Sequence, residues 1–160
     1  MFRRFRICNL RDESGAALVE FALVLPILLV LVFGALDFGK AYNYWIDSTH
    51  LSASGARWAA VNKNPGASGG QSLQQYIRSQ ADSAELRNGG TSAVPSPVRV
   101  CISFPNGTSN VGDPVKVTVS TTYNFLNFLQ VQTGVTNKTI SGSATMRLEQ
   151  LPTNFSAGCT

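Results

Sequence analysis

Glu20 is the single carboxylate within an apolar run that extends from Gly15 to Leu36. An ionisable side chain is expensive to hold at the depth of a lipid bilayer, so a residue of this kind marks a candidate functional site. A carboxylate in such surroundings needs a cationic partner to offset the loss of hydration. The chemistry indicated for Glu20 is therefore charge pairing.

The rest of the sequence has no spacing typical of catalysis or metal binding. There is no CxxC or HxxxH pair, and His50 is the only histidine. Residues 66–70 formally match G-x-S-x-G, but a nucleophile elbow needs a strand before its serine and a helix directly after it. This serine lies in a Pro/Gly-rich stretch instead. We therefore predict no catalytic residues, no metal site and no cofactor, and we expect that the chain is not an enzyme.

The basic residues gather at the N-terminus, although the isoelectric point is near 9.2. Four arginines precede the apolar run, and the other basic residues form no stripe with interleaved aromatics, which argues against nucleic-acid binding. Basic residues that flank a first apolar segment stay on the cytoplasmic side. We therefore expect a cytoplasmic N-terminus and a translocated C-terminal part. The four arginines are Arg3, Arg4, Arg6 and Arg11.

The three cysteines divide between these two sides. Cys8 belongs to the basic leader, which leaves Cys101 and Cys159 on the translocated side. In an oxidising compartment these two could form a disulfide that staples the C-terminal tail to a strand, or they could remain two unpaired thiols. The sequence leaves both possibilities open.

The apolar run from Ala16 to Leu36 is long enough to span a membrane, since a helix of that length covers about 30 Å. A membrane helix tolerates Pro26 where local adjustments satisfy the freed carbonyl. A cleaved secretory signal is less consistent, because its apolar core would be shorter and would end in a small-x-small site. Asp37 is expected to mark the outer boundary. Aromatic residues near the outer headgroups are expected at Tyr42, Tyr44 and Trp45.

The helical pattern continues beyond Asp37 to about residue 61. One set of residues repeats in steps of three and four and is apolar or small, and this face is expected to pack on the domain that follows. Its members are Phe38, Tyr42, Trp45, Thr49, Ala53, Ala56 and Ala60. The opposite set is polar and includes Lys40, Asn43, Asp47, His50, Ser54 and Arg57. Asn62 and the following Pro-Gly are expected to end the helix.

Residues 62–160 are predicted to form an extracytoplasmic α+β domain. Ser72 and Gln75 resemble a capping box before a short helical stripe at 73–84. Alternating residues predict three half-buried, antiparallel strands, near 98–104, 115–120 and 140–148. The connection 124–131 contains four large apolar residues, which either bury under the sheet or form a surface for a neighbouring subunit.

Three motifs of the N-terminal half together resemble the TadE-like family, the minor pilins or pseudopilins of the Flp (Tad) pilus machinery of bacteria. They are GAALVEFALVLP at 15–26, FGALDFG at 33–39 and SGARWAA at 54–60, and SATMRLE at 143–149 is also similar. The resemblance covers about residues 15–60. It implies a pilin-like fold, in which a long transmembrane helix continues into a small antiparallel sheet domain. It does not distinguish the TadE type from the TadF type.

The resemblance also implies processing by a prepilin peptidase between Gly15 and Ala16. The basic leader 1–15 would be removed, and Glu20 would become the fifth residue of the mature chain, followed by Phe21. The new ammonium group at Ala16 lies about one helical turn from Glu20, and in pilin-like assembly a neighbour's N-terminus would pair with this carboxylate and set the register of assembly. The alternative is an uncleaved anchor in which Glu20 is protonated or paired.

The organisation that follows from the sequence has three parts: a leader at 1–15, a long helix at 16–61 and a domain at 62–160. The expected location is the bacterial inner membrane, with a single pass, a periplasmic domain and incorporation into an extracellular pilus. The expected partners are the prepilin peptidase, the major Flp pilin, a second minor pseudopilin and the inner-membrane Tad platform. The rival hypothesis is a permanently anchored extracytoplasmic binding domain.

Overall fold

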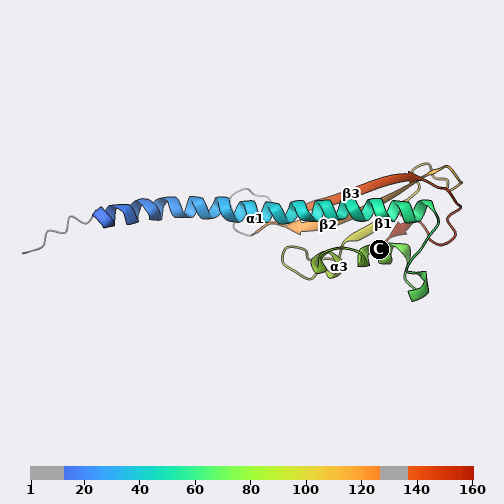
Figure 1. Ribbon diagram of the computed structural model, residues 1–160, viewed down its shortest axis with the longest axis horizontal. Coiled ribbons are helices and arrows are strands. Elements are labelled where there is room, and N and C mark those ends of the chain that lie inside the picture. The colour runs from blue at the N-terminus through green and yellow to red at the C-terminus, as the bar shows by residue number, and fades with distance from the viewer. Residues whose placement is uncertain (1–12, 127–136) are drawn as a thin grey trace, which may run out of the picture. The chain divides into compact units, whose positions relative to one another are not determined.

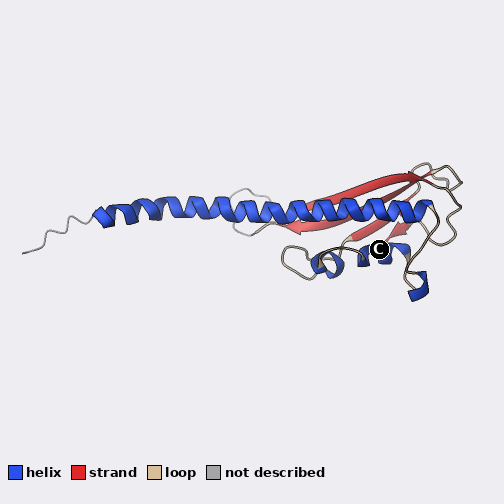
Figure 2. Ribbon diagram, viewed as in Figure 1, coloured by secondary structure: helices blue, strands red, loops and turns tan. Residues whose placement is uncertain are grey.

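The computed structural model describes residues 13–126 and 137–160 and has an α+β fold (Figures 1 and 2). It divides into two compact units, with the boundary between Leu36 and Asp37. The four N-terminal arginines, Cys8 and residues 127–131 of the predicted apolar connection lie outside the described residues.

Helix α1 extends from Glu13 to Ala60 and contains Pro26. Within the first unit its large apolar side chains are exposed all round the helix, and none of its most apolar stretch is buried within the protein. Among the described residues it is the one helix long and apolar enough to cross a membrane. A helix that is apolar on every side is suited to a lipid environment.

The second unit contains a four-stranded antiparallel sheet with the order β3-β2-β1-β4. The strands are β1 (Arg99–Ser103), β2 (Pro114–Asn124), β3 (Asn137–Arg147) and β4 (Gly158–Cys159). Strands β1 to β3 confirm the three strands predicted from alternation. In β2 every second side chain from Val115 to Tyr123 is buried. Because successive side chains of a strand point to opposite sides of the sheet, β2 has one buried face and one polar face.

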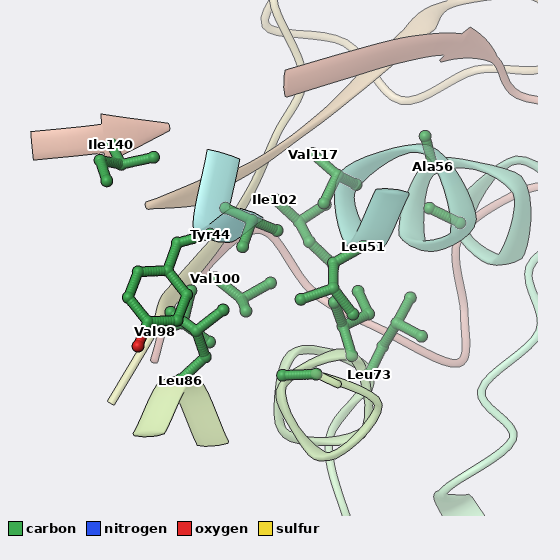
Figure 3. Close-up of a cluster of buried hydrophobic side chains, with 14 of the residues drawn as sticks. Tyr44, Leu51, Ala56, Leu73, Leu86, Val98, Val100, Ile102, Val117 and Ile140 are labelled. Atoms are coloured by element: carbon green, nitrogen blue, oxygen red, sulfur yellow. The ribbon is translucent and has the colours of Figure 1, made fainter. Parts of the chain in front are cut away.

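Helices cover the buried face of the sheet (Figure 2). They are the part of α1 from Asp37 onward, α2 (Leu73–Ser79) and α3 (Ala84–Asn88). Figure 3 shows how side chains from all three helices and from β1, β2 and β3 meet in one cluster. The core thus lies between two layers, which is the arrangement of an α+β domain with helices on one side of its sheet.

Helix α1 packs on the domain with a face that matches only part of the predicted one. Ala56 and Ala60 of the predicted face are buried, whereas Phe38, Tyr42 and Trp45 are exposed. The buried face is built mainly from small residues. It includes Ser48, Leu51, Ser52, Gly55, Ala56 and Ala59. The prediction was wrong for the three aromatic residues because periodicity favours the largest apolar residues, whereas a close helix–sheet contact requires small ones.

Two glycines show how close this contact is. A Cβ atom added at Gly142 in β3 would lie 2.5 Å from the Cα atom and from the backbone nitrogen of Thr49 in α1. A Cβ atom at Gly55 would lie 2.6 Å from Cδ1 of Ile77 in α2. The sheet therefore approaches the helix backbone itself, and a side chain at position 142 has no space.

Asn62 ends α1 and ties the C-terminal segment to it. Its φ of 51° lies in the left-handed region, which asparagine tolerates better than most residues. The Oδ1 atom of Asn62 accepts hydrogen bonds from the backbone nitrogens of Thr153 (3.0 Å) and Asn154 (2.9 Å). The backbone nitrogen of Glu149 donates to the carbonyl oxygen of Ala60 (2.8 Å). The predicted helix end is confirmed, and it also serves as an attachment point.

The predicted capping box at Ser72 and Gln75 is present at the start of α2. The single helical stripe predicted at 73–84 is instead two short helices. Residue Ser83 caps the second of them, α3, by accepting a hydrogen bond from the backbone nitrogen of Leu86 (3.1 Å). A serine that accepts such a bond starts a new helix, which explains the break.

Strand β4 is held at the edge of the sheet by a disulfide. Cys101 and Cys159 lie directly opposite each other in the antiparallel β1–β4 pair and are bonded, with their Cα atoms 4.1 Å apart. Beside them, Val100 and Thr160 exchange two backbone hydrogen bonds of 3.0 and 3.2 Å. A two-residue strand has little pairing energy of its own, so the covalent link is its main attachment.

Replacing Gly142 with alanine should destabilise the domain. The added methyl group would overlap the backbone of α1, and overpacking of this kind costs about 1–3 kcal/mol. Gly69→Ala is the matched control, because a Cβ atom at that position meets nothing within 4 Å. Urea unfolding of the full chain in detergent, followed by tryptophan fluorescence, should show the loss for Gly142→Ala alone. Equal stability of the two variants would refute the close contact.

Replacing Cys159 with serine should change the mobility of the protein on a non-reducing gel and lower its free energy of unfolding. The disulfide closes a loop with a sequence separation of 58, and losing such a link costs about 2–4 kcal/mol. Reduction of the wild-type protein should reproduce the loss, whereas the variant should not respond to reductant. A variant with wild-type mobility would contradict the pairing.

Candidate functional site

The four residues predicted for processing and registry lie at the beginning of α1. Gly15 is half-buried, and Ala16, Glu20 and Phe21 are exposed. Their exposure leaves them accessible to an external protein, whether an enzyme or an assembly partner. The reactive groups that these four residues present are a peptide bond and one carboxylate.

Gly15 is not explained by packing. A Cβ atom added at this position meets nothing within 4 Å, and the residue lies within the helix. Glycine in a helix is less favourable than alanine by about 1 kcal/mol. A glycine that lowers helix stability and fills no tight space has its reason outside the described contacts of the chain.

Asp37, which was predicted to mark the outer boundary of the apolar run, is a buried carboxylate and the first residue of the second unit. Only 4% of its surface is exposed. One oxygen, Oδ1, accepts a hydrogen bond from the hydroxyl of Tyr123 in β2, and Oδ2 accepts one from the backbone nitrogen of Leu126 (2.9 Å). These two hydrogen bonds connect the first residue of the second unit to the C-terminal end of β2. A buried carboxylate without such donors would be strongly destabilising.

A second phenol–carboxylate pair lies beside the first. The Tyr44 hydroxyl donates to Glu85 in α3, and the rings of Tyr44 and Tyr123 are 5.6 Å apart. Tyr44 is 5% exposed, so its predicted place near the lipid headgroups was wrong. Burial of the ring, followed by its hydrogen bond to Asp37, raises the pKa of Tyr123. The phenol of Tyr123 therefore remains a protonated donor, and the cluster joins α1, β2 and α3.

The first part of the predicted connection 124–131 contributes to this cluster. The ring of Phe125 meets the ring of Tyr123 edge-on, with centroids 5.1 Å apart. Leu126 is half-exposed, at 47%. The described residues of the connection thus include one that packs against the core and one that remains at the surface.

Asp47 is the second buried carboxylate of α1. Its Oδ2 atom accepts a hydrogen bond from the backbone nitrogen of Asp82 (3.0 Å), whereas its Oδ1 atom is buried without a partner among the described residues. Burial is the main cause that raises the pKa of Asp47, and the neighbouring Asp82 carboxylate adds to it. His50 and the hydrogen bonds from Asp82 and Ser83 act in the opposite direction.

The remaining candidates do not combine into a reactive site. Ser68 of the G-x-S-x-G match is exposed in a short 3-10 helix, and His50 is exposed on α1. Cys101 and Cys159 are bonded to each other on the polar side of the sheet. Within residues 13–126 and 137–160, no group of three or more His, Cys, Asp or Glu side chains could hold a metal ion.

The buried phenol–carboxylate pairs were missed by sequence reasoning. Asp37 and Tyr123 are separated by 86 positions, and Tyr44 and Glu85 by 41. The available signal was the spacing of Asp37, Ala41, Tyr44, Asp47 and Leu51 in steps of three and four, which places two carboxylates on one helix face with apolar residues.

Replacing Asp47 with asparagine should raise the free energy of unfolding at pH 7 by about 1 kcal/mol, since an ionised oxygen without a partner is removed. The folded-state pKa of Asp47 lies above the unfolded value. Its stabilising contribution is therefore present below the unfolded pKa and is lost as pH rises through the folded pKa. The gain should disappear below about pH 4.

Asp113→Asn is the control with the opposite sign. Hydrogen bonds from the Thr108 side chain and the Asn110 backbone lower the pKa of Asp113, so its contribution is present at neutral pH and is lost on acidification. Urea titrations of the full chain at several pH values measure both variants. A stability gain for Asp47→Asn that did not change with pH would show that it does not come from removing the buried charge of Asp47.

Comparison with known proteins matches the segment that carries the predicted processing residues. The family model described as TadE-like protein covers residues 15–57, which include Gly15, Ala16, Glu20 and Phe21. This is the family that the three N-terminal motifs resemble. No curated protein and no solved structure matches the chain significantly. Residues 15–57, which form most of helix α1, are therefore similar to the TadE-like family.

Proposed function

We propose that the chain is a non-enzymatic minor pilin, or pseudopilin, that takes part in assembly of a Flp (Tad) pilus. The observation that carries this proposal is the TadE-like match at 15–57 on a helix able to span a membrane. The family implies membership of the Tad pilus machinery. The more specific role, in which the chain is cleaved and then pairs with a neighbouring subunit, is proposed from the residues at the start of the matched segment.

The proposed role depends on cleavage between Gly15 and Ala16. Cleavage would create an ammonium group at Ala16, one helical turn from the exposed Glu20. Within lipid, a carboxylate and a cation each lower the cost of burying the other. An ammonium from a neighbouring subunit that paired with Glu20 would fix the axial register between two helices.

The proposed location and partners follow from this role. The N-terminus begins in the cytoplasm of a bacterium, α1 crosses the inner membrane, and the domain lies in the periplasm before incorporation into a pilus. A prepilin peptidase, the major Flp pilin, a second minor pseudopilin and the inner-membrane platform are the partners. The TadE-like match supports this set as the machinery in which its family acts.

Processing is tested by replacing Gly15 with alanine and determining the N-terminus of the membrane form by intact mass. The wild-type chain should begin at Ala16, and Gly15→Ala should keep its leader. Because an added Cβ atom at Gly15 meets nothing within 4 Å, the variant should fold normally, and lost cleavage would reflect recognition by the peptidase. A wild-type chain that still begins at Met1 would instead indicate a permanently anchored binding domain.

Glu20→Gln in the same host separates registry from processing. This change keeps the size of the side chain and removes its charge, so cleavage should proceed while incorporation into pili falls by about tenfold or more. Val19→Leu, at the neighbouring exposed position, is the matched control. If the Glu20→Gln variant were incorporated into pili normally, the registry role of Glu20 would be refuted. The proposal that the chain is cleaved after Gly15 would be unaffected.

A further inference from the structure

The face of the sheet that points away from the helices is rich in hydroxyl groups. Three facing pairs of Ser and Thr side chains, each with one member from β2 and one from β3, occupy its centre. The pairs are Thr118 and Ser143, Ser120 and Ser141, and Thr122 and Thr139. All six residues are exposed or half-buried. Neither Asp nor Glu occurs in β1, β2 or β3. This surface of the three strands is called the hydroxyl face below.

Three cationic side chains lie on the hydroxyl face, one in each strand. They are Arg99 in β1, Lys116 in β2 and Arg147 in β3. Arg147 lies opposite Pro114, so Lys116 and Arg147 are diagonal neighbours, about 7–8 Å apart. Arg99 lies opposite Ser120, which places it about 14 Å from Lys116 along the strands. Within residues 13–126 and 137–160, none of the three forms an ion pair.

The acidic residues of the second unit are directed elsewhere. Residues 37–160 contain nine Lys or Arg residues and six Asp or Glu residues. Asp37 and Asp47 are buried, and Glu85 accepts the hydrogen bond from Tyr44. The other three lie outside the strands and are Asp82, Asp113 and Glu149. The surface of the unit is therefore positive, and on the hydroxyl face no carboxylate of the strands offsets the attraction for an anion.

The side chains of this face limit the class of its partner. Its outward residues include no aromatic and no branched aliphatic side chain. Protein interfaces depend on buried apolar and aromatic anchors, and single-stranded nucleic acid is held by stacking on aromatic rings. Duplex DNA is bound through many phosphate contacts, which three separated cations do not supply. The surface therefore does not match a protein or a nucleic acid.

An acidic polysaccharide matches the surface better. The hydroxyl of Ser or Thr donates one hydrogen bond and accepts two, and a sugar hydroxyl has the same capacity. The hydroxyl groups repeat about every 4.8 Å between strands and about every 6.8 Å along a strand, so an extended polymer that lies on the sheet meets several of them. Arg and Lys form charge-assisted hydrogen bonds with carboxylates. The face thus offers contacts both to sugars and to acidic groups.

We propose that the hydroxyl face binds peptidoglycan, a polymer of sugars that carries carboxylates on its peptides. This inference rests on the proposed function for the compartment only, because a periplasmic domain is in contact with this polymer. Arg99, Lys116 and Arg147 bind its carboxylates, and the Ser and Thr rows bind its sugar hydroxyls. Each contact is weak, but neighbouring sites on one polymer are held at a high effective concentration, which raises the overall affinity.

Binding is tested by sedimentation of the purified full chain, in non-ionic detergent, with washed insoluble peptidoglycan. Most of the protein should sediment with the polymer at about 50 mM salt, and several-fold less at about 500 mM, because salt screens the charge pairing. An equal mass of sheared duplex DNA should leave most of the protein on the peptidoglycan. Displacement by DNA would identify a general polyanion surface and overturn the assignment.

A triple variant tests the cations. Arg99→Gln, Lys116→Gln and Arg147→Gln together should lower the apparent affinity for peptidoglycan by about tenfold or more. The control removes two arginines and one lysine from exposed positions on the helices, so it changes the net charge equally. It combines Lys40→Gln, Arg57→Gln and Arg87→Gln. The control should bind as the wild type does, and an equal loss in both variants would show that only net charge matters.

Ser143 tests the centre of the face. Ser143→Glu introduces a carboxylate there and should weaken binding several-fold more than Ser143→Gln, which has the same size without the charge. Because the position is exposed, the urea midpoints of both variants should stay close to that of the wild type. Equal binding by the two variants would place the contact elsewhere on the domain.

The failure of this inference differs from the failure of the proposed function. A wild-type chain that does not sediment with peptidoglycan defeats the inference, whether or not the membrane form begins at Ala16. A membrane form that begins at Met1 defeats the proposed function, because the sedimentation experiment does not depend on cleavage.

Discussion

The close contact between α1 and the sheet at Gly142 is the constraint on which the domain depends. The backbone of Thr49 lies where a side chain at position 142 would begin, so the helix and β3 meet almost backbone to backbone. Such an approach requires small residues on the facing side of the helix, and Ser48 and Ser52 are fully buried there. Three large aromatic residues of α1, Phe38, Tyr42 and Trp45, lie on the outside instead.

This constraint explains which parts of the fold could be predicted. Strands β1 to β3 were found because half-buried strands alternate, and Val115 to Tyr123 in β2 do so. The long helix was found because its repeat is strong. The face of α1 that packs was found only in part, because the hydrophobic repeat includes the buried Ala56 and Ala60 but also selects Phe38, Tyr42 and Trp45, which are exposed. Close packing selected serine, glycine and alanine, which a hydrophobic repeat does not distinguish.

The parts that were missed depend on contacts between distant positions. The sequence predicts that Asp37 marks a boundary. Its buried position depends on a hydrogen bond from the hydroxyl of Tyr123, which lies 86 positions later in the sequence. Strand β4 contains two residues, too few for any alternation, and it pairs with β1 beside the Cys101–Cys159 disulfide. The pattern of residues within a short stretch of sequence does not indicate which distant residues pair. The residues predicted for processing and registry lie within six positions of one another in a linear motif, so their prediction required no contact between distant positions.

Two carboxylates of α1 show how the domain and the N-terminal segment differ. Asp37 receives one hydrogen bond from a phenol and one from a backbone nitrogen of its own domain, so the chain satisfies it internally. Glu20 is exposed in a segment of apolar residues, which offer a carboxylate no donor side chains. In water its exposure costs nothing, but in lipid the same exposure is expensive. A segment that keeps this residue while placing it at membrane depth requires a donor from another molecule or from a new N-terminus.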